Sequence, residues 1–253
     1  MNKYILVVLF ILSVLTIKAQ HVTDENITRF EKSNKYFVNG DFDRALAGYQ
    51  TIEKEGVVSP GLYTNIGATY FKLHQLGNSL LYFEKGILIA PLDTELNFNK
   101  NKILDKLDKT VSINNATIDS RQSNFLGVAN YLNIILVLLM VISSVLFFTF
   151  LKFPSRSNKL FNTTFFKYIF TASLVLVLVL LVIIKAYKSK RFGINTSSVT
   201  MLNLGPSTYS KVIDSLNEGF KAEVINKYEN WYEIKDAQGR IGWVKENSFT
   251  EIK

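Results

Sequence analysis

Few side chains in this sequence are suited to catalysis or metal binding. The chain has no cysteine and only two histidines, His21 and His74, whereas nucleophilic catalysis needs a serine or cysteine beside a histidine. Two isolated histidines also lack the helical or hairpin spacing of metal ligands. Gly193 and Gly205 stand alone and form no dinucleotide-binding or phosphate-binding fingerprint. We therefore expect no catalytic residue, no metal, no cofactor and no enzymatic activity.

Carboxylates are the other groups that could act as acids or bases. Glu53, Glu55 and Glu84 lie among lysines in segments of helical periodicity. Such spacing is typical of a helix surface, where opposite charges lie three or four residues apart. We expect these three side chains to be solvated.

The net charge of +8 is concentrated in one stretch of the chain. Residues 122–195 carry eight basic and no acidic side chains, whereas residues 21–121 have 12 basic and 13 acidic ones. Residues 196–253 have seven basic and eight acidic side chains. A basic chain is a candidate for nucleic-acid binding, but the parts outside this stretch are close to neutral. We expect no nucleic acid as a partner.

Two apolar stretches, uncharged over residues 126–151 and 168–184, predict a membrane protein. Residues 126–151 would form a helix about 39 Å long at ~1.5 Å per residue, enough to cross a hydrocarbon core of about 30 Å. Residues 168–187 are shorter, but Lys167 and Lys185 can extend to the headgroups. The alternative is a pair of buried core helices. We expect two transmembrane helices, with the lipid bilayer as a partner.

The N-terminus has the outline of a secretory signal. A short positive start precedes an apolar stretch at residues 4–17, and Ala19 offers a small residue for cleavage. Residues 1–19 are therefore either a cleaved signal peptide or a retained anchor. Either outcome exports the chain that follows. We expect a multi-pass inner-membrane protein with its N-terminal and C-terminal modules on the periplasmic side.

Residues 24–108 contain a helical repeat. An offset of 34 residues aligns Tyr36 with Tyr70, and 34 is the period of the tetratricopeptide repeat. The second unit resembles this family at seven positions, namely Tyr63, Ile66, Gly67, Tyr70, Ser79, Phe83 and Pro91. The resemblance implies an α-helical solenoid of two helix–turn–helix repeats, closed by a capping helix that follows Asp93.

Local signals predict the turns and helix starts of this segment. Gly40 and Gly77 are predicted turn residues, whereas Asp41 and Asp93 are predicted to cap the helices that follow them. Residues 109–124 lose the periodicity and are rich in Ser, Thr and Asn, as is typical of a flexible linker.

Resemblance to tetratricopeptide repeats also implies a groove that holds a peptide or a helix. Asn34 and Asn65 occupy positions from which such proteins bind a peptide backbone, and Phe37 and Phe71 would add apolar contacts. A clamp for a C-terminal carboxylate is not expected, because the basic positions of that clamp are not basic in this chain. The alternative is structural, with solvated asparagines and phenylalanines in the core.

The pattern changes to short β-type runs in the last sixty or so residues of the chain. Residues 199–204, 221–226, 231–235 and 240–244 are predicted strands, separated by turns that contain glycine. Their spacing predicts a small all-β barrel.

Residues 196–253 resemble the bacterial SH3-like domain. Leu204 stands before a Gly-Pro-Ser sequence where that family usually has arginine, and residues 239–244 have its Gly-x-x-Gly-Trp-Val ending. The resemblance implies an aromatic peptide-binding face formed by Trp231, Tyr232 and Trp243. The alternative is that the tryptophans pack within the barrel.

The order of these parts resembles the BatE-like family of the Bacteroides aerotolerance operon. The predicted fold class is accordingly a multidomain membrane protein with a tetratricopeptide-repeat (TPR) solenoid, two transmembrane helices and a small SH3-like barrel. The resemblance implies a non-enzymatic scaffold for envelope integrity or tolerance of oxidative stress, which docks membrane or envelope proteins such as sister proteins with von Willebrand A-type domains. The alternative function is a cell-wall sensor whose SH3-like domain binds peptidoglycan.

Overall fold

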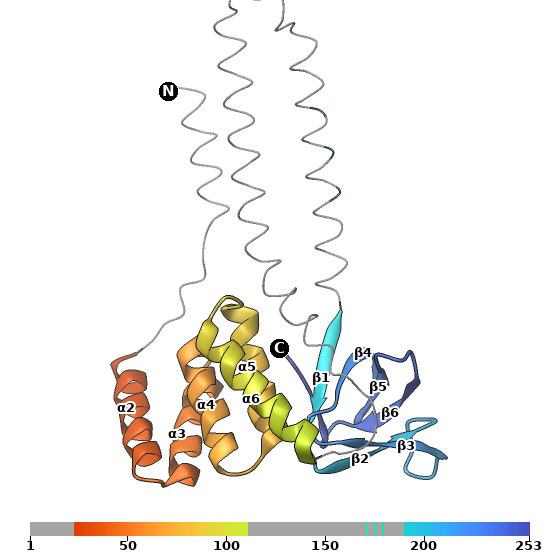
Figure 1. Cartoon of the computed structure of the whole chain (residues 1–253), viewed down its shortest axis with the longest axis horizontal. Coiled ribbons are helices and arrows are strands. Elements are labelled where there is room, and N and C mark those ends of the chain that lie inside the picture. The colour runs from red at the N-terminus through yellow and green to blue at the C-terminus, as the bar shows by residue number, and fades with distance from the viewer. Residues whose placement is uncertain (1–22, 111–170, 172–174, 176–178, 180–189) are drawn as a thin grey trace, which may run out of the picture.

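The computed structural model describes residues 23–110 and 190–253, together with residues 171, 175 and 179. The first range forms helices and the second forms an antiparallel sheet (Figure 1). The helices are α2 (Asp24–Val38), α3 (Phe42–Lys54), α4 (Pro60–Lys72), α5 (Leu76–Ile89) and α6 (Thr94–Thr110). The strands are β1 (Arg191–Asn195), β2 (Val199–Asn203), β3 (Val212–Asn217), β4 (Lys221–Tyr228), β5 (Trp231–Lys235), β6 (Ile241–Lys245) and β7 (Phe249–Glu251).

The predicted fold class of a membrane protein with two transmembrane helices is wrong for the described part of the chain. No helix there is both long enough and apolar enough to cross a bilayer. The longest of α2 to α6 has 17 residues, about 26 Å at ~1.5 Å per residue, and these helices carry charged side chains. The predicted spans at residues 126–151 and 168–187 lie outside the described residues, apart from residues 171, 175 and 179.

The predicted multi-pass localisation in the inner membrane depended on those two helices, and it is corrected with them. The predicted signal peptide at residues 1–19 lies outside the described residues. The same holds for the predicted linker, residues 109–124, beyond its first two residues.

Side-chain caps start four of the five described helices. Thr23 Oγ1 accepts from Asn26 N at 3.2 Å, Asp41 accepts from Arg44 N at 3.3 Å, and Ser59 caps α4 before a proline at its first position. Asp93 accepts from the backbone N–H groups of Glu95 and Leu96. The predicted caps at Asp41 and Asp93 are confirmed. Only α5 lacks a local cap among these helices.

The helices pack as two hairpins, α2 with α3 and α4 with α5, and α6 lies against α5. Gly67 lets α4 approach the Phe83 ring closely, because a Cβ at Gly67 would lie 3.1 Å from that ring. Gly48 faces Ser33 in the same way, since its Cβ would lie 2.0 Å from the Ser33 hydroxyl. Gly67, which matches the repeat pattern, therefore lies between the helices of its pair, and Gly48, which was not predicted, does the same in the first pair.

Gly77 is an exception to the predicted turns. It lies inside α5, and the α4–α5 turn instead passes through His74, an exposed residue with a φ of 61°. A Cβ at Gly77 would lie 2.6 Å from the carbonyl oxygen of Asn195 in β1. This glycine therefore serves the contact between helices and sheet, not the turn.

The seven strands form one antiparallel sheet in the order β3-β2-β6-β5-β4-β1-β7. The four strands predicted from the sequence correspond to β2, β4, β5 and β6, and they are confirmed to within a few residues. Strands β1, β3 and β7 were not predicted. The sheet core contains Leu202, Leu216, Ala222, Val224, Tyr232, Ile234, Val244 and Phe249.

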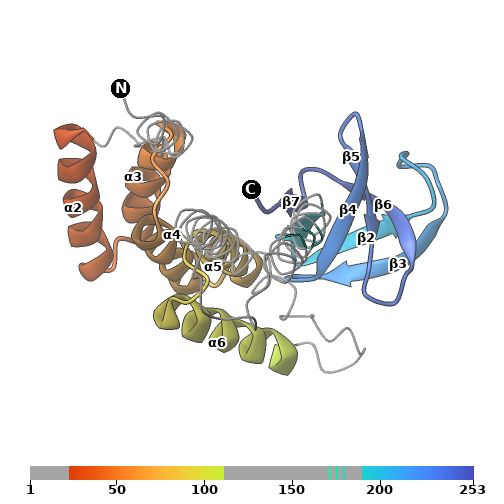
Figure 2. The same ribbon diagram turned by 90° about the horizontal axis from the view of Figure 1, so that it is seen from above.

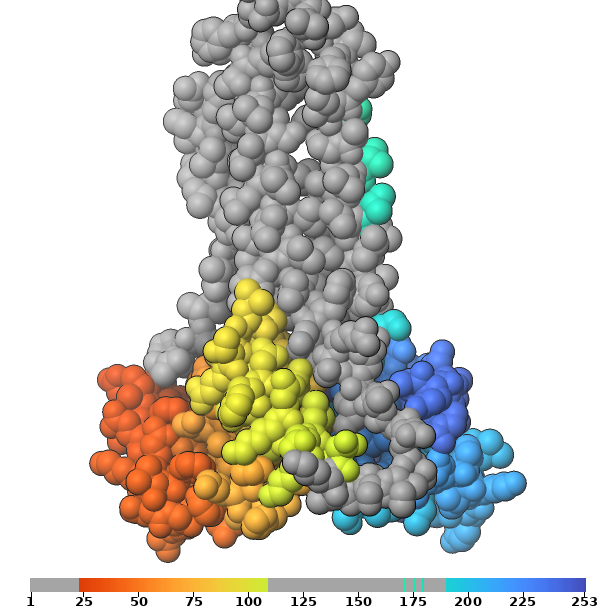
Figure 3. Space-filling view, in the orientation of Figure 1, coloured from red at the N-terminus to blue at the C-terminus, as the bar shows by residue number. Residues whose placement is uncertain are grey.

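Helices and sheet adjoin at α5. Seen from above, α2, α3, α4 and α5 follow one another (Figure 2), and β1 packs against α5. Figure 3 shows the same division, with the helices from red to yellow-green and the strands in cyan and blue. Ile194 of β1 is fully buried in the core of the helices, and Ile252 packs against that core. The two halves therefore share apolar core.

Candidate functional site

A seam in the sheet opens a pocket between β2 and β6. These two described strands share one paired position, Asn203 opposite Trp243, whereas β2 pairs with β3 along its whole length. Because the strands run antiparallel, the earlier residues of β2 face the end of β6 across an unpaired gap. A pocket with a volume of about 280 Å³ occupies this region. Its lining residues are Val199, Thr200, Met201, Asn203, Thr208, Val212, Trp231, Lys245 and Ser248.

Apolar side chains on β2 and β3 form one wall of the pocket. Val199, Met201 and Val212 are 51%, 52% and 49% exposed. Successive residues of a strand point to opposite faces, so Val199 and Met201 point outward while Leu202 points into the core. Half-exposed apolar side chains gathered at one pocket are typical of an interaction surface.

The predicted aromatic face is divided between the two sides of the sheet. Tyr232 belongs to the sheet core, and its hydroxyl donates to Glu246 Oε1 at 2.9 Å. Burial raises the pKa of Tyr232, and the hydrogen bond to Glu246 raises it further. Trp231 and Trp243 lie on the other face, since β5 and β6 alternate in register with Tyr232 opposite Val244. Trp231 lines the pocket and is only 8% exposed.

Lys245 provides the pocket with its charge. It is the cross-strand partner of Trp231, and its Nζ lies 5.7 Å from the centre of the Trp231 ring. Lys245 is exposed and forms no ion pair with any described residue. Among the described residues that line the pocket, it is the only titratable one. Sequence reasoning missed Met201 and Lys245; the outward alternation of β2 and β6 was the available signal.

The predicted peptide-binding asparagines of the helices are bonded to each other. Asn65 Nδ2 donates to Asn34 Oδ1 at 2.9 Å, and the hydroxyl of Tyr49 donates to the same oxygen at 2.6 Å. Burial raises the pKa of Tyr49. Both amides are half-buried and lie on α2 and α4. The network joins these helices through α3.

The two predicted phenylalanines lie in different surroundings. Phe37 packs edge-on against Phe42, with 5.5 Å between the ring centres. Phe71 lies under two amines of α6, with Lys102 Nζ at 5.3 Å and Lys106 Nζ at 4.7 Å from the ring centre. Both rings are half-buried and pack against the helical core.

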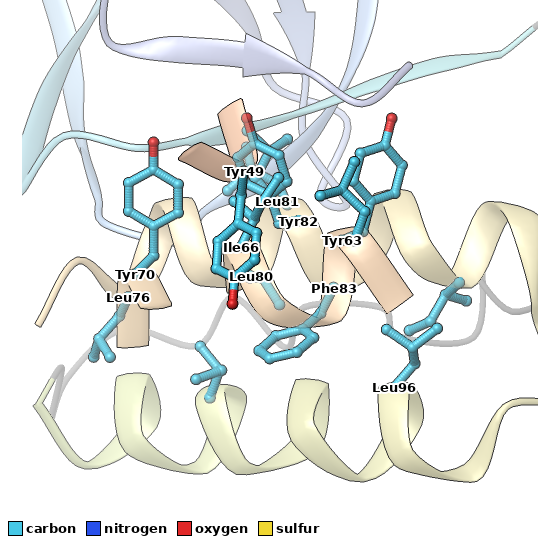
Figure 4. Packing of buried hydrophobic residues seen from close by; sticks show 14 of the residues in the cluster. Tyr49, Tyr63, Ile66, Tyr70, Leu76, Leu80, Leu81, Tyr82, Phe83 and Leu96 are labelled. Carbon is cyan, nitrogen blue, oxygen red and sulfur yellow. The ribbon is translucent and has the colours of Figure 1, made fainter. Parts of the chain in front are cut away.

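A second polar network lies among α3, α4 and α5. It adjoins the buried residues of the helical core, among which Figure 4 labels Tyr63 and Tyr82. Glu53 accepts from the Tyr82 hydroxyl at 2.7 Å and from Lys85 Nζ at 2.9 Å, and the Lys85 amine also lies 4.6 Å from the Tyr82 ring centre. Burial raises the pKa of Tyr63 to about 12, and the negative charge of Glu53 adds to the shift. Burial likewise raises the pKa of Tyr82. Each charge here has a partner, which is typical of a structural network.

Buried charges join the helices to the sheet. Glu84 of α5 pairs with Lys221 of β4 at 3.2 Å, and these side chains are 1% and 6% exposed. Lys100 of α6 is 1% exposed, and burial lowers its pKa; the Glu84 carboxylate opposes this shift and the Lys221 charge adds to it. The predicted exposure of Glu84 is therefore wrong. An acidic residue in a mostly apolar helix was the signal for this contact.

The sheet also completes the start of α5. Gly77 N donates to Glu218 Oε1 at 2.6 Å, from the turn between β3 and β4. A carboxylate is favourable there, because the first N–H groups of a helix lack partners and the helix dipole is positive at that end. A Cβ on Gly219, whose φ is 78°, would collide with the Leu107 side chain of α6. The helix without a local cap thus receives one from the sheet.

The described residues include no group of three or more His, Asp or Glu side chains that could hold a metal ion. His74 is exposed in the α4–α5 turn, and His21 lies outside the described residues.

Comparison with known proteins matches residues 198–249 to the family described as the bacterial SH3 domain. The match begins just before β2 and ends at the first residue of β7, so it contains the whole pocket. It supports the predicted SH3-like domain and does not extend to the helices. No curated protein matches the chain.

Proposed function

We propose that this chain is a non-enzymatic scaffold that docks a protein partner through the pocket of its bacterial SH3 domain. The pocket supports this function most directly. A buried tryptophan, three half-exposed apolar side chains and an exposed lysine converge at it. Aromatic anchors in a desolvated pocket with a polar rim are typical of protein-binding sites.

The helices form the second part of the proposal. Two hairpins and a final helix are consistent with two tetratricopeptide repeats and a capping helix, as the 34-residue offset predicts. Resemblance to the BatE-like family would make von Willebrand A-type sister proteins the partners, in a complex for envelope integrity or tolerance of oxidative stress. A non-enzymatic role is supported because Lys245 is the one titratable side chain among the described lining residues, and Ser248, which also lines the pocket, has no histidine beside it there.

A capture experiment with matched variants tests this function. The full chain is used to purify partners from cell extract, alongside the variants Met201→Glu and Ile241→Glu. Ile241 is 50% exposed, much as Met201 is, but does not line the pocket. A partner captured by the wild type and Ile241→Glu but lost with Met201→Glu is the expected result. Equal capture by all three proteins would exclude the pocket as the docking site.

Purified cell wall is the second matrix of this experiment. Retention of the full chain on peptidoglycan, with loss in Met201→Glu, would mean that the pocket binds the cell wall and not a protein partner. Circular dichroism of each variant confirms that the fold is retained.

A further inference from the structure

The size of the pocket limits what can enter it. Its volume of about 280 Å³ lies at or below the lower end of the range for small-molecule sites, roughly 300–1,000 Å³. The polar atoms of Thr200 and Asn203 already bond within the domain, to Asn195 Oδ1 and to the Met201 carbonyl oxygen. One large side chain fits this space better than a cofactor or a sugar chain.

The pocket wall selects an apolar side chain. Val199, Met201 and Val212 expose about half of their surface, and Trp231 lies buried behind them. The thioether of methionine is flexible and polarisable, so Met201 can adapt to the shape of an incoming group. Burial of these surfaces by an apolar side chain is favourable at about 25 cal/mol per Å².

The charge beside the pocket selects an acidic neighbour. Other cations of the domain already have carboxylates, such as Lys227 with Glu246 and Arg240 with Asp214. Lys245 forms no such pair within the described part of the chain and lies over the Trp231 ring instead. A carboxylate placed there would gain a charge-assisted hydrogen bond. The acidic Glu233 lies opposite Trp243, one position further along that face. Its negative charge disfavours a ligand carboxylate there, so the carboxylate is expected at the Lys245 end.

The seam offers backbone groups of β2 as well, apart from the Met201 carbonyl oxygen, which already accepts from Asn203 Nδ2. Strand β2 pairs with β6 at Asn203 and not over its earlier residues, although both strands are fully described. An extended segment can use such an unpaired strand side for main-chain hydrogen bonds while its side chains enter adjacent pockets.

We propose that the seam between β2 and β6 binds an extended protein segment in which an acidic residue stands beside a large apolar one. The apolar side chain occupies the pocket against Met201 and Trp231, and the carboxylate pairs with Lys245. This inference rests on the proposed docking function and adds the chemistry of the partner.

Three fluorescein-labelled hexapeptides test it with the full chain in a fluorescence-anisotropy titration. The first has the sequence Gly-Ser-Leu-Asp-Ser-Gly, the second replaces Asp with Asn, and the third replaces Leu with Ala. We expect the Leu-Asp peptide to bind, and each replacement to weaken binding about tenfold or more, the size of one lost charge-assisted contact or buried side chain. Equal binding of the Asn peptide, or no binding of the Leu-Asp peptide, overturns the inference.

Two lysine variants locate the carboxylate. Lys245→Met should reduce binding of the Leu-Asp peptide to that of the Asn peptide, and raised salt should weaken wild-type binding. Lys235→Met is the matched control, because Lys235 is also exposed on this face but does not line the pocket. Equal loss in both variants would contradict a specific contact at Lys245.

The capture experiment separates the two hypotheses. If Met201→Glu loses a partner while none of the hexapeptides binds, the docking function stands and the acidic–apolar chemistry is wrong. If a muropeptide binds in place of the Leu-Asp peptide, the ligand is cell wall. If Met201→Glu retains every partner and the Leu-Asp peptide does not bind, both are wrong.

Discussion

Glu84, Lys100 and Lys221 form a buried cluster between helices and sheet. Glu84 pairs with Lys221 at 3.2 Å, and its Oε2 atom accepts no hydrogen bond within the described part of the chain. A buried ion pair contributes little net stability when it is intact, but the loss of one partner is costly because a charge stays buried. The cluster thus fixes which surfaces of helix and sheet meet.

Loss of Glu84 should destabilise the protein more than loss of Lys221. Glu84→Gln leaves the buried Lys221 amine without the carboxylate that it pairs with, and we expect it to lower the free energy of unfolding by about 3–5 kcal/mol. Lys221→Met should cost less, because Lys100 remains near Glu84 and compensates its charge. Urea denaturation of both variants measures the difference. A larger loss for Lys221→Met would contradict the proposed role of Lys100.

The raised pKa of Tyr63 predicts how the free energy of unfolding changes at alkaline pH. Its pKa rises from 10.0 to about 12 in the folded protein through burial and the charge of Glu53. Above pH 10 the unfolded chain releases this proton while the folded chain retains it. The contribution of Tyr63 to the free energy of unfolding is therefore fully present below pH 10 and is lost as the pH rises toward 12. Urea denaturation at pH 9, 10 and 11 measures this slope. Tyr63→Phe should flatten it, and an unchanged slope would assign the effect to other tyrosines.

At the scale of elements, α5 is the helix that joins the other helices to the sheet. Most of its residues are buried, because it packs between α4, α6 and β1. A helix that is apolar nearly all round belongs in an interior, and α5 also takes its N-terminal cap from Glu218. The sheet is therefore part of what makes this segment helical.

Two glycines at the same position of two helices test this contact. Gly61 and Gly77 are each the second residue of their helix, α4 and α5. Gly61→Ala meets nothing within 4 Å and should stabilise the protein by up to about 1 kcal/mol through helix propensity.

A Cβ on Gly77 would lie 2.6 Å from the Asn195 carbonyl oxygen, so Gly77→Ala should destabilise by about 1–3 kcal/mol. Thermal denaturation compares the two variants. If both glycines respond alike, the sheet is not held against α5 in solution.

At the scale of the whole molecule, helices and sheet should unfold together. Their apolar core is shared through Ile194, and buried charges cross between them. Both tryptophans of the chain lie in the sheet, so fluorescence reports on the sheet while circular dichroism at 222 nm is dominated by the helices. We expect the two signals to give one coincident transition in urea. Separate midpoints for the two probes would mean that the halves fold independently.

Local pattern explains how much of this structure could be predicted. Strand β5 was predicted residue for residue, because large apolar side chains alternate between turns. Strand β7 was missed because three residues carry no period. Trp231 was predicted as a site residue, but the pocket was not, since β2 with Met201 meets β6 with Lys245 only through the single pairing of Asn203 with Trp243.

The sequence alone determined the elements whose signals are local: capped helices with a 34-residue offset, and alternating strands that identify a bacterial SH3 domain. The tertiary structure decided that these parts meet. Gly77 and Glu218 are 141 residues apart in the chain, and no local propensity or period links residues at that separation. Their contact depends on complementary surfaces, a glycine beside a carbonyl and a carboxylate at a helix start, which exist only once both halves have folded.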